Sequence, residues 1–295
     1  MASNKQEWID AIKHLRLHFS LLLMPVFLFA VSQLPEIDYR IISLTFIILH
    51  VLVYPASNIF NSYYDRDEGS VGGLRCPPPP NNKMLWLANI LDASAILLSL
   101  SIHQSFSILV SSYILASRLY SYPPIRLKKY PIIGFFVIFI FQGAFTFYLT
   151  RYSLLHWHVN ATNLYGLQVN TILPMLSSSF QIGAIYPLTQ IYQHKSDLAD
   201  GVTTLSYKLG YRGTFIFAGI MFGIATLFYF LYFSATDIND FYIFTVVQMP
   251  IIGYFVYWAS KVWKDTQYAD YKHTMYMNVI AAVILNLFFL YLVLT

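Results

Sequence analysis

Residues 41–69 read IISLTFIILHVLVYPASNIFNSYYDRDEG, an apolar run that ends in a cluster of amides and acids. Residues 41–62 are long enough to cross roughly 30 Å of hydrocarbon as one helix. The whole chain has a matching composition, with 57% hydrophobic and 11% charged residues and a mean hydropathy of +0.54. A soluble domain carries about 25% charged residues. The sequence therefore predicts an integral membrane protein.

Apolar runs of spanning length recur along the chain and indicate an all-α bundle of about nine transmembrane helices in a single domain, residues 1–295. A polar segment between Arg151 and Thr171 predicts an extramembrane loop. The predicted spans are 17–35, 41–62, 84–102, 105–122, 131–150, 172–192, 213–234, 241–260 and 274–294.

The basic residues favour one orientation in the membrane. With the N-terminus in the cytoplasm, every one of the 18 Lys and Arg residues except Arg40 and Arg151 falls on the cytoplasmic side. Such a bias is typical of multi-pass proteins, and we expect a bacterial inner membrane. The net charge of +4 is spread between apolar runs rather than gathered in one patch, which argues against a nucleic-acid partner.

The polar cluster after the second predicted span offers oxygen ligands on one helical face. Asn61 and Asp65 are four residues apart, and Asn58 lies one turn deeper. Acids at a membrane boundary are often only solvated, but amides inside an apolar helix indicate a function. Carboxylate and amide oxygens are ligands that suit Mg²⁺, which is commonly held by one or two carboxylates and substrate phosphates.

A second acid cluster follows the sixth predicted span. Gln193 and Asp197 are four residues apart, and Asp200 follows Asp197 by three. The same helical spacing predicts that these oxygens also share a face and form the second half of a metal site.

A basic stretch follows the fourth predicted span, where residues 120–129 read YSYPPIRLKK. The two prolines end the helix, and the cations after them are explained either by anchoring at the cytoplasmic surface or by phosphate binding.

Together these stretches resemble the UbiA superfamily of intramembrane prenyltransferases. That family has nine helices, an NDxxDxxxD motif after the second helix, a YxxPPxRLK-like loop after the fourth and a DxxxD motif after the sixth. The resemblance covers the whole chain, and the motifs occur in the expected order. The matching residues are Asn61 and Asp65 in the first motif, 122–128 in the basic loop, and Asp197 with the tail 201–210 in the second motif.

The acid motifs depart from the family pattern at three positions. Ser62, Gly69 and Gln193 stand where the family usually has acids, although Asp200 is an additional acid near the third. A weaker hold on Mg²⁺ is the expected consequence.

The resemblance implies a helical bundle around a central cavity and Mg²⁺-dependent transfer of a polyprenyl group from a prenyl diphosphate to an aromatic or other lipophilic acceptor. It implies catalytic roles for Asp65, Asp197 and Tyr122. The other implied roles are diphosphate binding by Arg66, Arg75, Arg126 and Lys128, and metal binding by Asn58, Asn61, Asp65, Gln193, Asp197 and Asp200.

Two other functions are alternatives. A non-catalytic relative that binds or moves a lipid or an aromatic metabolite is favoured by the altered acids. A secondary transporter would carry charged residues in the middle of its spans. We expect no charged residues in the helix centres of this chain, which argues against a transporter.

Overall fold

The computed structural model describes residues 4–34, 38–66, 69–155 and 169–295. These ranges are helical, and the only β pairing within them is an isolated bridge between Val71 and Leu74. Contacts within the chain divide it into two compact units, described in turn; the single domain stays a prediction. Unit 1 comprises Met1–Leu21, Pro35–Leu127 and Tyr152–Asn160, and unit 2 comprises Leu22–Leu34, Lys128–Arg151 and Ala161–Thr295.

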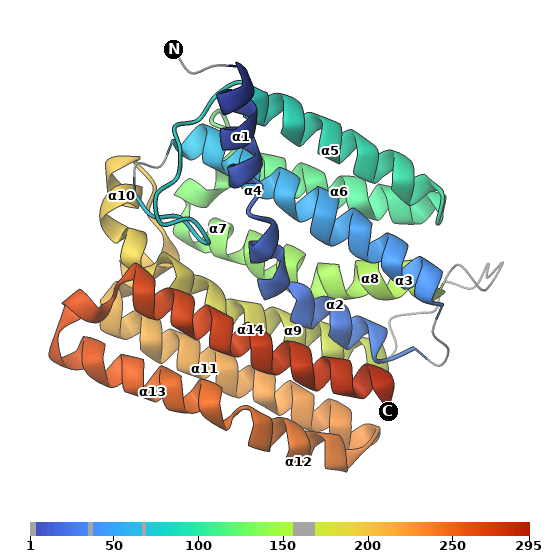
Figure 1. Ribbon diagram of the computed structural model, residues 1–295. Coiled ribbons are helices and arrows are strands. Elements are labelled where there is room, and N and C mark those ends of the chain that lie inside the picture. The colour runs from blue at the N-terminus through green and yellow to red at the C-terminus, as the bar shows by residue number, and fades with distance from the viewer. Residues whose placement is uncertain (1–3, 35–37, 67–68, 156–168) are drawn as a thin grey trace. The chain divides into compact units, whose positions relative to one another are not determined.

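Unit 1 is built on three neighbouring helices, α4, α5 and α6, with α1 against the first two (Figure 1). Ala11 of α1, Ile59 and Phe60 of α4, and Met84 and Ala88 of α5 form its buried apolar cluster. Its elements are α1 (Asn4–His14), η1 (Leu17–Leu22), α3 (Tyr39–Phe46), the π-helical η2 (Ile47–Val53), α4 (Tyr54–Asp65), α5 (Lys83–Leu100) and α6 (Gln104–Ser121).

The end of α4 is set by Arg66, which adopts a left-handed conformation with φ of 51° and donates its N–H to the Ser62 carbonyl. A left-handed residue stops the helix and leaves Asp65 in its last position. The proline run that follows is held against α1, because His14 Nε2 lies 2.8 Å from the Pro78 carbonyl oxygen.

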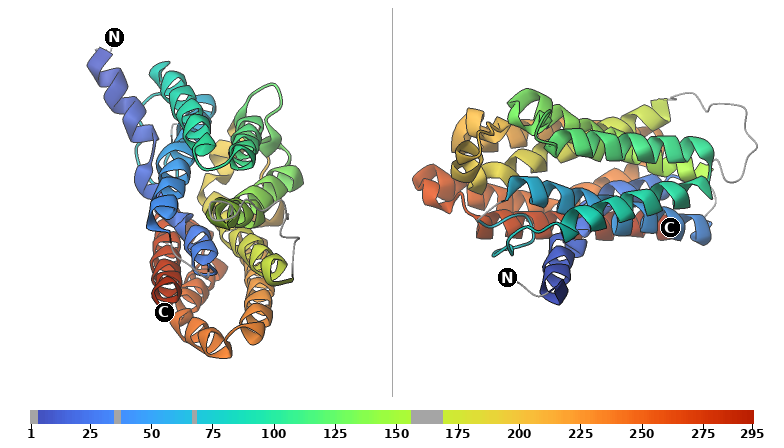
Figure 2. Two further views of the ribbon diagram at one scale, coloured as in Figure 1. Left: turned by 90° about the vertical axis from the view of Figure 1, so that its right-hand side faces the viewer. Right: turned by 90° about the horizontal axis from the view of Figure 1, so that it is seen from above.

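Unit 2 contains the long C-terminal helices (Figure 2), and α13 packs against both α11 and α14. The α9 helix packs along α11, and the Phe29 ring from α2 stacks on Phe289 at 4.7 Å. The elements are α2 (Met24–Val31), η3 (Leu127–Lys129), α7 (Pro131–Ile138), η4 (Phe139–Phe145), α8 (Thr146–Leu155), α9 (Val169–Gln190), η5 (Ile191–Gln193), α10 (His194–Ala199), α11 (Leu205–Ala235), α12 (Ile238–Val247), α13 (Met249–Lys264), η6 (Thr266–Tyr268) and α14 (Tyr271–Leu294).

Helices occur at all nine predicted spans, which confirms the all-helical membrane fold. Within the described residues, six helical stretches are long and apolar enough to cross a bilayer, or seven if the pair Asn4–Leu22 and Met24–Val31, bent by 48°, is one span. The helices α6 and α9 are not among the six, and both carry several serines and at least one glutamine. The count of nine is therefore not confirmed.

The predicted loop between Arg151 and Thr171 falls mostly on residues 156–168, outside the described part of the chain. At its start the helix continues further than predicted, because α8 runs to Leu155 and buries Ser153 against Thr45, with 3.0 Å between their hydroxyl oxygens.

Candidate functional site

The first acid motif and the basic loop meet in unit 1. An Nη2 of Arg126 lies 3.4 Å from Oδ1 of Asp65, and the Asp65 side chain is only 7% exposed. Arg126 is left-handed, with φ of 45°, and its N–H donates to the Tyr122 carbonyl at 2.7 Å. This turn contains the two prolines, and from its end the guanidinium reaches Asp65 at the end of α4. The structure thus brings together an acid and a cation that lie 61 residues apart in the chain.

The side chain of Asn61 is held by the same pair of helices. Ser121, the last residue of α6, donates its hydroxyl to Oδ1 of Asn61 at 2.6 Å. One turn further along α4, the Tyr64 ring meets the exposed Tyr122 ring edge-on, with 6.0 Å between centroids. The predicted residues Asn61, Asp65, Tyr122 and Arg126 therefore lie along one interface between α4 and the end of α6.

Asn58 is directed elsewhere. Its amide nitrogen donates to the Leu15 carbonyl at 3.3 Å, and Arg16 donates to the Asn58 carbonyl at 3.1 Å. These hydrogen bonds join α4 to the segment between α1 and η1. Asn58 therefore links α4 to this segment, whereas Asn61 and Asp65 form hydrogen bonds with residues at the end of α6 and in the loop after it.

Arg66 and Arg75 are both exposed. Arg66 lines a hollow of about 610 Å³ with Tyr63, whose hydroxyl donates to Oδ1 of Asn82 at 3.2 Å. The other lining residues are Pro77, Pro79, Pro80 and Asn81. Arg75 accepts the hydroxyl of Ser70 at its backbone carbonyl.

The second acid motif lies in unit 2 on the short helix α10. Gln193 precedes the helix with φ of −97° and ψ of 0°, Asp197 lies within it, and the exposed Asp200 follows its last residue. The continuous helix assumed for the spacing of Gln193 and Asp197 is thus broken just before α10. Lys128 lies in the short η3 element, half-buried.

His194 anchors α10 to the start of α11. Its Nε2 lies 2.8 Å from the Ser206 hydroxyl, and its ring stacks on Tyr211 at 4.8 Å. Burial lowers the pKa of His194 to about 4, so the ring is neutral near pH 7. This histidine was not among the predicted site residues, and its contacts hold α10 against the start of α11.

The expectation of uncharged helix centres is wrong. Asp92 lies in the middle of α5, is only 8% exposed, and accepts hydrogen bonds from Nε of Arg118 at 2.8 Å and from Nη2. Arg118 was counted among the cytoplasmic loop cations but lies inside α6. Each is the only charged residue in its predicted span, which is the signal that reveals the pair. The argument against a transporter, which relied on uncharged helix centres, therefore no longer holds.

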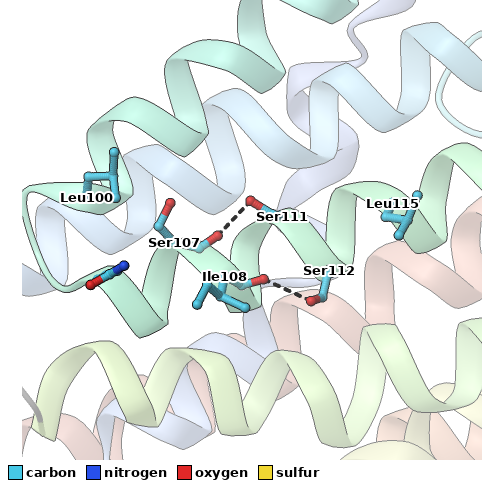
Figure 3. Close-up of a pocket in the computed structure, with 7 residues that line it drawn as sticks. Leu100, Ser107, Ile108, Ser111, Ser112 and Leu115 are labelled. Atoms are coloured by element: carbon cyan, nitrogen blue, oxygen red, sulfur yellow. Dashed lines mark hydrogen bonds between the residues drawn. The ribbon is translucent and has the colours of Figure 1, made fainter.

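A second hollow, of about 360 Å³, runs along α6 (Figure 3). Two of its serines form hydrogen bonds within α6, since Ser111 donates to the Ser107 carbonyl at 2.8 Å and Ser112 to the Ile108 carbonyl at 2.9 Å. The hydroxyl of Ser107 donates to the Ile96 carbonyl of α5 at 3.1 Å. None of the predicted site residues lines this hollow, whose remaining lining residues are Leu100, Gln104 and Leu115.

The chemistry of the two acid motifs suits a hard cation such as Mg²⁺, because each supplies only carboxylate and amide oxygens. Among the described residues, however, no three His, Cys, Asp or Glu side chains gather as a metal-binding group. The residues therefore fit Mg²⁺ in kind, but they need oxygens from amides, waters or substrate phosphates to complete its coordination.

Comparison with solved structures shows a shared fold. A structure described as digeranylgeranylglyceryl phosphate synthase in membranes matches with a TM-score of 0.63 and 18% identity, over 98% of this chain and 100% of that one. A UbiA homolog from Archaeoglobus fulgidus bound to DMAPP and Mg²⁺ matches with a TM-score of 0.68 and 15% identity, over 97% and 99%. The same homolog bound to GPP and Mg²⁺ gives 0.65 and 15%, over 97% and 100%.

No curated protein matches the chain by sequence. The model of the UbiA prenyltransferase family, by contrast, matches residues 21–292. This match covers nearly all of the helical chain, including both acid motifs and the basic loop. The chain therefore belongs to the UbiA prenyltransferase family.

Proposed function

We propose that this protein is a Mg²⁺-dependent membrane prenyltransferase that transfers a polyprenyl group from a prenyl diphosphate to an aromatic or other lipophilic acceptor. Family membership supports prenyltransferase activity in general, and UbiA homologs of similar fold have been solved with DMAPP or GPP and Mg²⁺. The observation that carries the proposal is the contact between Asp65 and Arg126. It joins an acid suited to a metal with a cation suited to a diphosphate.

The reaction begins with cleavage of the bond between the allylic carbon of the donor and the diphosphate oxygen, and the electron pair leaves with the diphosphate. The acceptor then forms a bond to that carbon and releases a proton. Charge develops on the departing group, so Arg126, Lys128 and Arg75 assist by binding it. The exposed ring of Tyr122 offers an electron-rich face to the allylic cation.

The first motif would offer Mg²⁺ the oxygens of Asn61 and Asp65, and the second motif would offer those of Gln193, Asp197 and Asp200. When bound, Mg²⁺ neutralises negative charge on the diphosphate. With acids missing at three family positions, the protein oxygens alone bind the metal weakly until the phosphates add theirs. Metal and donor should therefore bind synergistically. We place this site on the cytoplasmic side of a bacterial inner membrane, with the N-terminus in the cytoplasm.

The test is Mg²⁺-dependent binding and turnover of geranyl diphosphate by purified protein. We expect Asp65→Asn and Asp197→Asn to abolish turnover while the protein stays folded and inserted, because each loses a charged ligand. Gln193→Asp should preserve or raise activity, since it restores a family acid. The matched control is Asp265→Asn, whose carboxylate caps the short η6 turn and should leave turnover unchanged.

A non-catalytic lipid-handling protein is the second candidate, favoured by the residues Ser62, Gly69 and Gln193 at positions where the family usually has acids. Its signature is a native protein that binds no prenyl diphosphate with Mg²⁺ and two Asn variants that still complement a deletion strain. That combination would refute the transferase proposal.

A further inference from the structure

The ion pair of the buried Asp92 and the half-buried Arg118 lies within the three-helix part of unit 1. The two side chains are 12% and 18% exposed, and they come from the middle of α5 and from the last turn of α6. Removing two charges from water costs several kcal/mol for each ion, and attraction between them repays this only in good geometry. Burial of such a pair inside helices that face lipid therefore points to a role beyond stability.

Arg118 makes a second contact, to the helix that carries the first acid motif. Its guanidinium carbon lies 3.9 Å from the centroid of the Phe60 ring, and Phe60 is the residue before Asn61 on α4. The edge of the guanidinium thus binds Asp92 of α5 while its face lies on α4. A planar guanidinium makes both contacts at once, whereas the ammonium of lysine is a compact point charge without a stacking face.

Further contacts join residues 61–65 of α4 to residues 121–126 at the end of α6 and in the loop after it. Beyond Arg118 and Phe60 comes the hydrogen bond from Ser121 to Asn61, at 2.6 Å. The edge-on rings of Tyr122 and Tyr64 follow, and the contact of Arg126 with Asp65 lies at the end. Asp92 of α5 holds Arg118, which makes the first of these contacts by lying on the Phe60 ring.

We propose that Arg118, held by Asp92, is a positioning residue that sets the register of α4 against α6 and thereby aims Asn61 and Arg126 at the prenyl diphosphate. The pair acts through the α4–α6 interface and does not itself touch the donor. Because the two charges neutralise each other, they add no net charge to the site. This proposal deepens the proposed function and rests on it for its ligand.

The first measurement is Mg²⁺-dependent binding of geranyl diphosphate to the full chain, in an Arg118→Lys variant with and without Asn61→Ala. In the native background Asn61→Ala should weaken binding about tenfold, as loss of a contact to a charged group does. Arg118→Lys should itself weaken binding about tenfold, and adding Asn61→Ala should then change little. Such non-additivity marks two residues that act together.

Arg151→Lys is the matched control, because Arg151 of unit 2 is another partly buried arginine in a helix and donates to the Gln33 carbonyl at 3.2 Å. It should leave both the affinity and the effect of Asn61→Ala unchanged. Full additivity of Arg118→Lys and Asn61→Ala would overturn the proposal, because Arg118 would then act independently of Asn61.

A second measurement needs no ligand. Cysteines at Tyr64 and Tyr122, in a Cys76→Ser background, report the α4–α6 register through their rate of cross-linking by a short bismaleimide. We expect Arg118→Lys and Asp92→Asn to slow this reaction several-fold, and Arg151→Lys to leave it unchanged. An unchanged rate in the first two variants would overturn the positioning role. Failure of native protein to bind geranyl diphosphate, with slowed cross-linking, would refute only the transferase function.

Discussion

At the scale of single residues, the cations after α6 differ in their surroundings. Arg126 reaches Asp65 across the interface with α4, whereas Lys129 lies over the ring of its neighbour Tyr130, with 5.0 Å from Nζ to the centroid. Lysine and arginine near a membrane surface are often only topology determinants. The contact with a predicted metal ligand is the feature that distinguishes Arg126 from such anchors.

Replacing Arg126 or Lys128 with alanine should therefore weaken donor binding. A charge-assisted hydrogen bond contributes about 1.5–3 kcal/mol, which corresponds to a tenfold or greater loss of affinity for geranyl diphosphate, measured by titration in the presence of Mg²⁺. Lys129→Ala is the control from the same loop and should bind normally. If all three variants bound geranyl diphosphate with the affinity of the native protein, Arg126 and Lys128 would be membrane anchors only.

Ser62 occupies the position of the first motif where the family usually has an acid. Its side chain is buried, and its hydroxyl has no hydrogen-bond partner in the part of the chain that the structure describes. A carboxylate at this position would be buried without compensation, which costs far more than a hydroxyl. The neighbouring Asn61 and Asp65 supply the polar atoms that meet α6 instead.

At the scale of elements, two glycines shape unit 2. Gly210 near the start of α11 has φ of +69° and ψ of 175°, a break inside an otherwise continuous helix. Gly143 lets η4 approach α9, since an added Cβ would lie 2.4 Å from the Cα of Ser179. Gly210 needs a backbone conformation that other residues adopt only at a cost in free energy. Gly143 is needed because there is no room for a side chain at its position.

Gly210→Ala should lower the free energy of unfolding by about 1–3 kcal/mol, the usual cost of a sparsely populated backbone region. Gly143→Ala should be more destabilising, because the added Cβ would clash with the backbone of Ser179, which cannot move aside as a flexible side chain can. Gly223→Ala in the same α11 helix is the control: a Cβ there meets no atom within 4 Å, and alanine favours a helix by about 0.5–1 kcal/mol. Thermal unfolding in detergent measures all three, and equal melting temperatures would contradict this account.

At the scale of the whole molecule, the distribution of Lys and Arg predicts which ends of the helices face the cytoplasm. The structure shows where that prediction is testable. Ser153 lies beyond the fifth predicted span but is buried, so a cysteine there would not report on the outer side. Ser196 in α10 and Thr236 after α11 are both exposed and are expected on opposite sides of the membrane.

In a Cys76→Ser background, a cysteine at Ser196 should react with a membrane-impermeant maleimide only from the cytoplasmic side. A cysteine at Thr236 should react only from the outer side. The reason is that a single apolar stretch, residues 213–234, separates the two positions. Labelling of both from the same side in intact cells and inverted vesicles would exclude the predicted orientation.

The sequence by itself determined the helical membrane fold, because the length and apolarity of a segment are local properties that decide whether it crosses a bilayer. It also identified the acid motifs and the basic loop, whose spacing is short. Tertiary structure alone decided which of these residues meet. Asn61 and Asp65 contact residues of α6 and its loop, whereas Asn58 turns to Leu15 and Arg66 lines a separate hollow.

The ion pair of Asp92 and Arg118 is also a contact that only the tertiary structure decided. Each residue was visible as a lone charge in an apolar span, but their pairing depends on how α5 and α6 pack together, which neither segment encodes alone. Local sequence indicates which segments are helical and which residues they carry. The direction of its polar side chains is fixed by the neighbours that satisfy them, since a polar group inside a membrane protein must find its partner within the fold.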